Sequence, residues 1–163
     1  MVGFLVGMES QNKMSKINFK QFLSLIFVVG FFVFLAINFK TPSDIKFIKI
    51  AGEKVPVELA ITEEAQLQGL SFREDLKLNT GMLFIFQDST PHYFWMQDMN
   101  FPIDIIWISR DREILYIKKD ARPEDYPETY GGDKNSKYVL EVSAGFSIEH
   151  DLQVGDIVFF LTK

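Results

Sequence analysis

The feature that most constrains this chain is a run of 19 residues without a charged side chain, from Gln21 to Phe39, bounded by Lys20 and Lys40. As a helix, a run of this length rises by about 28 Å, close to the hydrocarbon thickness of a bilayer at about 30 Å. A buried core helix would not be apolar around its whole circumference. The run therefore predicts a single transmembrane helix over residues 21–39, held in the lipid bilayer.

The charges around this run predict its orientation. Lys13, Lys16 and Lys20 precede it, and residues 1–43 carry four lysines against one glutamate. Residues 44–163 carry 13 basic and 21 acidic side chains. By the positive-inside rule, residues 1–20 form a cytoplasmic leader, and the part after Lys40 lies outside the cytoplasmic membrane as the exported part of a single-pass protein.

A cleaved signal peptide is the alternative, which would make the protein secreted. It is disfavoured because its apolar region is usually about 7 to 15 residues long and ends in an Ala-x-Ala-like site. Ala36 is the small residue near the end of the run, but the bulky Phe34 stands two positions before it. Met1, Met8 and Met14 each remain open as the translation start.

Composition excludes several functions. The chain has no cysteine, which removes thiolate catalysis, thiolate metal sites and disulfides. A net charge of −5 argues against a nucleic-acid partner, which would need a basic face. No cofactor motif is present, and neither His92 nor His150 lies in a recognisable nucleophile motif.

After a linker over residues 40–45, residues 46–163 form the predicted exported domain. Short apolar runs separated by turn residues predict antiparallel strands, and parallel βαβ winding is disfavoured because no long amphipathic segments alternate with them. Thr62–Leu70 predicts one short helix, capped by Thr62. The expected fold is mainly β, a compact antiparallel β-sandwich or barrel with one short helix. The predicted strands are Ile45–Ile50, Val55–Ile61, Met82–Phe86, Tyr93–Met96, Ile103–Ile108, Ile114–Ile117, Tyr138–Val142 and Ile157–Leu161.

Two segments of this domain differ from the rest in residue pattern, and each predicts a specific structure. Met82–Phe86 is apolar at every position, which indicates a central buried strand without a chemical role. Ala121–Ser136 contains Pro123, Pro127 and the pair Gly131-Gly132, and it predicts a long loop that could act as a lid or a binding loop.

The order of the motifs resembles that of the DUF192 (UPF0127) family, from about Val55 to the C-terminus. The resemblance implies a small, mostly β fold of sandwich or barrel type, often behind a signal peptide or membrane anchor, and it implies no particular activity. This chain departs from the family in having Gln97-Asp98 where Lys-Asn is usual, and Ser71 where Met is usual. The matching segments are Gly69-Leu70, Arg73, Gly81–Phe86, Phe94–Trp107, Tyr138–Val142, Gly145 and Gly155-Asp156.

The candidate ligand-binding residues are one cation, one aromatic and three acids embedded in or beside apolar runs: Arg73, Trp95, Asp98, Asp104 and Glu141. An unpaired carboxylate is costly in such a place, so the structural interpretation is an ion pair of Arg73 with Asp104 or Glu141. The functional interpretation is two carboxylates facing one cleft beside Trp95. Trp95 and Met96 point to opposite faces of a strand, so one belongs to the core and the other can floor a pocket.

These residues support three hypotheses. The leading one is a membrane-anchored, non-catalytic domain that binds an envelope polysaccharide or protein. The alternative is a carboxylate-dependent hydrolase acting on an envelope glycan. A further alternative is copper handling by His92 and Met96, since thioethers are soft ligands that suit cuprous copper.

Overall fold

The structure is a computed structural model that describes residues 23–24, 26–30 and 44–162. The chain divides into two units at Lys40, and the C-terminal unit is described here by itself. Most of the predicted anchor over residues 21–39 lies outside the described residues, as do the whole leader and most of the linker. Within the described part of the chain, no helix has the length and apolar character needed to cross a membrane.

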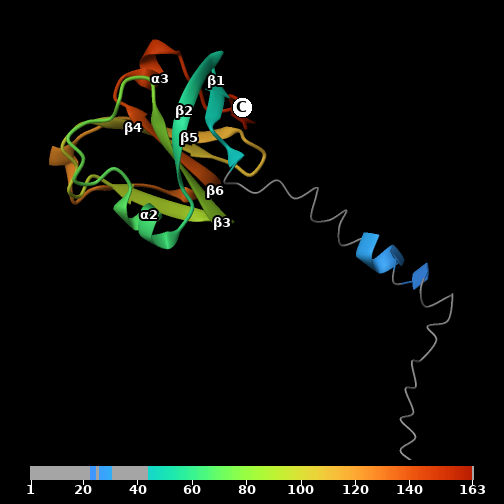
Figure 1. The fold of residues 1–163 in the computed structure, drawn as a ribbon. Helices are drawn as coiled ribbons and strands as arrows, with labels where there is room; N and C mark the ends of the chain where they lie inside the picture. Colours follow the sequence, from blue (N-terminus) through green and yellow to red (C-terminus); the bar gives the residue numbers. More distant parts are fainter. Residues whose placement is uncertain (1–22, 25, 31–43, 163) are drawn as a thin grey trace, which may run out of the picture. The chain divides into compact units, whose positions relative to one another are not determined.

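The domain is built on one seven-stranded sheet with the strand order β5-β4-β6-β3-β2-β1-β7 (Figure 1). The prediction of a mainly β fold is confirmed. Three short helical segments accompany the strands: α2 (Glu63–Gln68), η2 (Pro123–Asp125) and α3 (Phe146–Glu149). The strands are β1 (Phe47–Ile50), β2 (Glu53–Ala60), β3 (Gly81–Trp95), β4 (Ile103–Ile108), β5 (Ile114–Ala121), β6 (Thr129–Ser143) and β7 (Phe159–Leu161).

One strand pair corrects the expectation of a wholly antiparallel sheet. Strands β2 and β3 are parallel, with Val57 opposite Gly81 and Ala60 opposite Phe84. A parallel pair needs a crossover connection, which is usually a longer helix. Here the six-residue helix α2 and the segment over residues 69–80 make that crossover, so no long amphipathic segment was needed.

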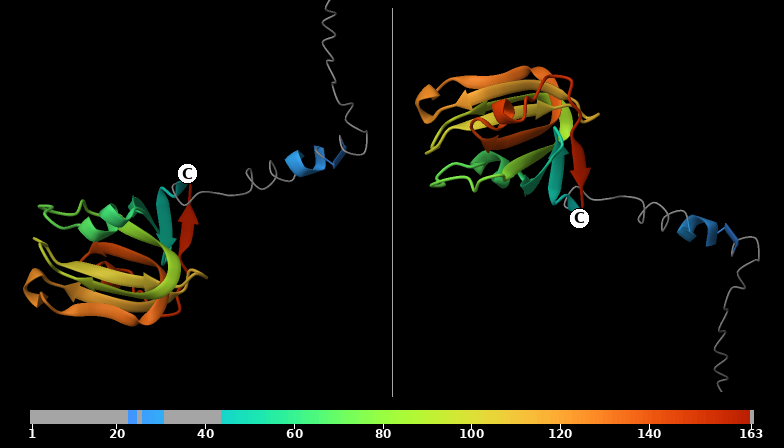
Figure 2. Two further views of the ribbon diagram at one scale, coloured as in Figure 1. Left: turned by 90° about the horizontal axis from the view of Figure 1, so that it is seen from below. Right: turned by 90° about the horizontal axis from the view of Figure 1, so that it is seen from above.

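The sheet curls until its two ends meet (Figure 2). Glu113, just before β5, forms a bridge with Ile157, just before β7. The amide of Ile114 donates to the carbonyl of Asp156 at 2.9 Å, and the amide of Val158 donates to the carbonyl of Arg112 at 2.8 Å. The fold is therefore a curled single sheet, closer to the predicted barrel than to a sandwich of two sheets.

Both faces of the central strands are covered by apolar side chains. One core cluster lies inside the curl and includes Leu83, Ile106 and Leu140. The other lies on the opposite face and includes Phe84, Trp107 and Val139. Because successive side chains of a strand alternate between faces, two cores explain why Met82–Phe86 is apolar throughout and why Ile103–Ile108 is apolar at every position except Asp104.

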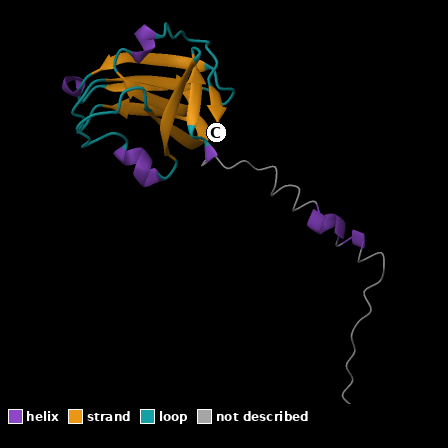
Figure 3. Ribbon diagram, turned by 45° about the horizontal axis from the view of Figure 1, so that its top comes forward, coloured by secondary structure: helices purple, strands orange, loops and turns teal. Residues whose placement is uncertain are grey.

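Two helices lie outside the curled sheet at opposite ends (Figure 3). The hydroxyl of Thr62 accepts a hydrogen bond from the amide of Ala65, which confirms the predicted cap of α2. The side chain of Gln66 fixes α2 to the sheet by donating to the carbonyls of Ala60 and Ile85 at 3.1 and 2.9 Å. The four-residue helix α3 has no counterpart among the elements predicted from the sequence.

The predicted long loop over Ala121–Ser136 is wrong. After the short η2, the chain enters β6 at Thr129 and pairs with β3, with Thr129 opposite Trp95 and Gly131 opposite Tyr93. Gly131 and Gly132 have positive φ, and a Cβ on Gly131 would lie 2.5 Å from the Trp107 ring. The two glycines therefore admit aromatic rings against the strand instead of marking a flexible loop.

Candidate functional site

A cleft of about 350 Å³ lies between α2, the turn that follows it, and β3, with one residue contributed by β6. The turn brings Gly69, Leu70 and Ser71 to one wall. Strand β3 supplies the opposite wall from both of its halves, because this 15-residue strand continues through two register shifts and does not end at Phe86. The expected strands Met82–Phe86 and Tyr93–Met96 are thus one element.

Aromatic rings make up much of the cleft. Phe94 packs edge-on against Phe84, with 4.9 Å between the ring centroids, and His92 stacks on Phe86 at 3.5 Å. Tyr93 and Trp95 also line the cleft and remain 61% and 50% exposed. Met96 is buried, so the prediction that one of Trp95 and Met96 belongs to the core is confirmed. The cleft therefore combines a packed aromatic base with accessible aromatic side chains.

Glu141 is the β6 residue in the cleft wall. It is only 5% exposed, and its Oε2 atom has no hydrogen-bond partner among the described residues. Burial raises the pKa of Glu141 from 4.5 to about 8, while the positive charge of Arg73 opposes that shift. Buried polar groups are normally hydrogen-bonded, so an unpartnered carboxyl in the wall of a cleft is a candidate binding or catalytic group.

Gly69 lies next to this carboxyl, on the wall of the cleft formed by the turn after α2. Its φ is +51°, and a Cβ placed there would lie 3.9 Å from Glu141 Oε2 and 3.4 Å from the Phe84 ring. Glycine adopts this backbone conformation without the cost that a side chain imposes. The turn after α2 therefore lies close to Oε2, which is itself buried.

Arg73 corrects the predicted ion pair. Its guanidinium donates to both carboxylate oxygens of Glu58, at 3.0 and 2.8 Å, and not to Asp104 or Glu141. This two-point contact raises the pKa of Arg73 and lowers the pKa of Glu58. Arg73 still reaches Glu141 as a longer-range charge, but it leaves the carboxyl of Glu141 without a direct cationic partner.

Asp104 has a structural environment. It is fully buried, and its carboxylate accepts hydrogen bonds from the amides of Ser147, Asp120 and Gly145 at 2.8, 2.9 and 3.3 Å. These contacts hold the start of α3 against the end of β5. Asp104 is not among the residues that line the cleft.

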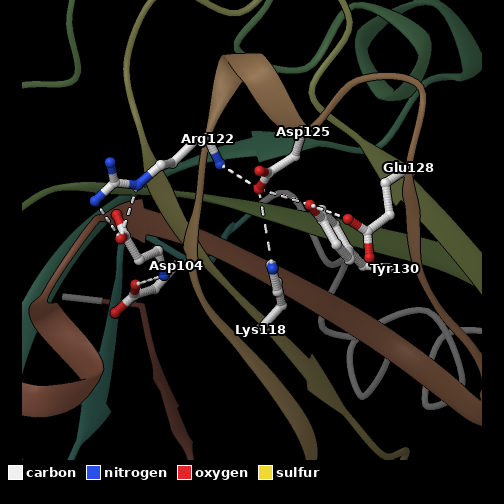
Figure 4. Close-up of polar contacts among 7 residues, drawn as sticks. Asp104, Lys118, Arg122, Asp125, Glu128 and Tyr130 are labelled. Carbon is white, nitrogen blue, oxygen red and sulfur yellow. Dashed lines mark hydrogen bonds and ion pairs between the residues drawn. The ribbon is translucent and has the colours of Figure 1, made fainter.

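A polar cluster holds the entry to β6, beside the strand end that carries Trp95 (Figure 4). The Asp125 carboxylate accepts hydrogen bonds from the Arg122 amide at 2.9 Å and the Tyr130 hydroxyl at 2.7 Å, both of which lower the pKa of Asp125. Lys118 lies 4.2 Å above the Tyr130 ring. The cluster fixes the strand that pairs with Trp95 and lies outside the cleft.

The remaining predicted residues are scattered. Asp98 lies in a turn with φ +57° and is outside the cleft, although its carbonyl accepts a hydrogen bond from the Phe72 amide at 2.8 Å. His92 lines the cleft and burial lowers its pKa, whereas Met96 belongs to the core and does not line the cleft. In the described ranges, no group of three or more His, Asp or Glu side chains is placed to hold a metal ion.

Sequence reasoning identified Trp95 and Glu141, which the fold brings to one cleft, and missed most of the rest of the lining. Phe84 and Phe86 were interpreted as core without a chemical role, yet both line the cleft. Glu63, Gln66 and Leu67 of α2 were not singled out at all. The available signal was strand parity, because Phe84 and Phe86 share a face with Met82, which pairs with Glu141 in the sheet.

Fold and cleft together define a class: a small domain of one curled sheet, with an aromatic cleft around a buried carboxyl. Residues 46–160 match the DUF192 family, whose description is "Uncharacterized ACR". The chain belongs to this family, as its motifs predicted. The comparison with curated proteins finds no match.

Two solved structures share the fold. A protein of unknown function from Novosphingobium aromaticivorans DSM 12444 is 29% identical, with a TM-score of 0.66 over 71% of this chain and 84% of that one. A protein from Sinorhizobium meliloti 1021, described as a proposed transcription regulator, is 28% identical, with a TM-score of 0.66 over 72% of this chain and 92% of that one. Both are similar to this chain in fold.

Proposed function

We propose that this protein is a binding domain of the cell envelope that takes part of a polysaccharide into the aromatic cleft, without catalysis. The observation that carries the proposal is the pairing, in one cleft, of the unpartnered Glu141 carboxyl with the half-exposed Trp95 ring. Sugar rings stack their apolar faces on aromatic side chains and need a few fixed polar groups for orientation.

The shape of the cleft supports an extended ligand. Tyr93, Phe94 and Trp95 follow one another along β3 and all three line the cleft, and Tyr93 and Trp95 are accessible. Ligand sites are usually apolar hollows with a small number of polar groups, and about 350 Å³ lies at the small end of their common range. An envelope protein partner would instead be expected to need a larger, flatter surface.

The hydrolase alternative is less well supported. Hydrolysis of a glycoside by two carboxylates requires that both flank the scissile bond. Asp104 is held by three backbone amides outside the cleft, so it is not the second carboxylate for Glu141. Glu63 is the other acid in the lining. Copper handling is supported only by His92, since Met96 lies in the core.

We also retain the membrane placement as a proposal. The 19-residue uncharged run and the lysines before it support an anchor in the cytoplasmic membrane with the domain outside. Release after cleavage of the N-terminal segment remains the alternative. In either case the domain would lie outside the cytoplasmic membrane.

Calorimetric titration of the full-length chain tests the binding proposal, with three disaccharides as probes: cellobiose, N,N′-diacetylchitobiose and the glucosamine disaccharide. We expect saturable binding of at least one, weakened several-fold by Trp95→Ala. Phe159→Ala is the matched control, because Phe159 is 51% exposed and lies outside the cleft. Absence of binding by all three, or equal weakening by both variants, would contradict the proposal.

A further inference from the structure

The charges around the cleft are one-sided. Its lining contains two acids, Glu63 and Glu141, and among the described residues that line it there is neither lysine nor arginine. Arg73 is the cation nearby, and its guanidinium is occupied by both oxygens of Glu58. Burial lowers the pKa of His92, which favours the neutral imidazole. An anionic ligand would therefore find no positive charge at this wall.

The aromatic rings also favour a positively charged ligand group over a negatively charged one. The face of an aromatic ring carries negative electrostatic potential and attracts ammonium groups placed over it. The ring of Phe84 and the Oε2 atom of Glu141 both lie within 4 Å of the Cβ position that Gly69 leaves empty. A positive group entering there would meet a ring and a carboxyl together.

From these observations, and resting on the proposed function, we propose that the ligand presents a protonated amine to Glu141, so that the cleft selects amino sugars over neutral sugars. A hydroxyl could donate to the carboxyl as well, but it would gain little from the aromatic faces or from the surplus of acids. An ammonium gains from both and supplies the ionic partner that Oε2 lacks.

Proton release follows from this pairing. Because burial raises the pKa of Glu141 to about 8, its carboxyl is mostly protonated at pH 7 in the free protein. An ammonium stabilises the carboxylate, so the acid proton leaves to the buffer as the ligand enters. The other charged or titratable groups in or beside the cleft are Glu63 on α2, His92 and Tyr93 on β3, and Arg73 with its partner Glu58.

The glucosamine disaccharide and cellobiose form the discriminating pair of probes, because an ammonium in one replaces a hydroxyl of similar size in the other. We expect the full-length chain to bind the glucosamine disaccharide at least about tenfold more tightly at pH 7, as a charge-assisted hydrogen bond provides. Titrations in two buffers of different ionisation enthalpy should show proton release for the glucosamine disaccharide alone. Glu141→Gln should remove both the preference and the release.

The outcomes separate this inference from the proposed function. Equal affinity for both disaccharides, without proton release, would overturn the amine proposal and leave the polysaccharide proposal standing. If the native chain binds none of the disaccharides, both the amine proposal and the polysaccharide proposal are overturned. The comparison of probes on the native chain needs no variant, so it remains decisive even if Glu141→Gln folds poorly.

Discussion

Asp104 and Glu141 lie on neighbouring strands of one sheet and face opposite sides of it. Asp104 is opposite Val142, and Glu141 is opposite Ile105, so the two carboxyls differ by one position in register and therefore by one face. Asp104 is surrounded by backbone donors, whereas Glu141 Oε2 has no partner among the described residues. The two buried acids thus have separate roles.

Asp104→Asn should destabilise the fold without affecting the cleft. The amide keeps one acceptor oxygen and turns an N–H group toward backbone donors, which weakens up to three hydrogen bonds. We expect a loss of about 2–4 kcal/mol in the free energy of unfolding, measured by chemical denaturation. Unchanged disaccharide affinity in the variant that remains folded is the accompanying expectation, and a selective loss of affinity would contradict the separation of roles.

Glu141 should make stability fall as pH rises. The folded chain holds the Glu141 proton up to about pH 8, whereas the unfolded chain releases it near pH 4.5. Between these values the folded state binds more protons, so the native free energy of unfolding declines by an amount on the order of 3–5 kcal/mol. Glu141→Gln removes this contribution. The free energies of unfolding of the native chain and of Glu141→Gln, measured by denaturation from pH 4 to 9, should therefore converge at low pH, and the variant should be the more stable one above pH 8. A difference between the two that stays constant with pH would contradict this expectation.

Gly131 should be among the least replaceable glycines. Gly131→Ala places a Cβ 2.5 Å from the fully buried Trp107, whose indole N–H donates to the His92 carbonyl at 2.9 Å. Gly52 is the matched control, since it also has positive φ but nothing within 4 Å of its Cβ position. We expect Gly131→Ala to lower the unfolding free energy by about 1–3 kcal/mol more than Gly52→Ala. Equal losses of unfolding free energy would mean that the positive φ alone, and not the contact with Trp107, requires glycine at position 131.

Single cysteines can test the predicted topology, because the natural chain contains none. Asp133→Cys in the exported domain should react with a membrane-impermeant maleimide in intact cells, since the Asp133 side chain is 73% exposed. Ser15→Cys in the predicted leader, which is present whichever methionine begins the chain, should react only after permeabilisation. Labelling of both, or of Ser15→Cys alone, would contradict the proposed orientation.

Much of the fold follows from local pattern. Strand β4 was predicted with its observed bounds, Ile103–Ile108, because a short, mostly apolar run between turn residues is typical of a buried strand. Helix α3 was missed because four residues carry little propensity, and its start is held by the distant Asp104. Long-range contacts of this kind leave no local signal.

In the candidate site, too, local sequence features were predictable and long-range contacts were not. Trp95 and Glu141 stand out because their residue types are unusual where they occur, and the fold places both in the cleft. The partner of Arg73 was not predictable, since the parallel pairing of β2 with β3 brings Glu58 opposite Met82. The glycines of β6 suggested a loop, because the rings that they admit come from other strands. Register and crossovers decide such contacts.

Carbon-13 NMR of the Glu141 carboxyl, assigned by comparison with Glu141→Gln, tests the central claim most directly. The account predicts that this carboxyl titrates near pH 8 in the free chain, because burial raises its pKa. It also predicts a clear fall of that pKa when the glucosamine disaccharide saturates the cleft. A carboxyl that titrates near 4.5 in the free chain, or whose pKa the saturating ligand leaves unchanged, would contradict the assignment of Glu141 as the binding group.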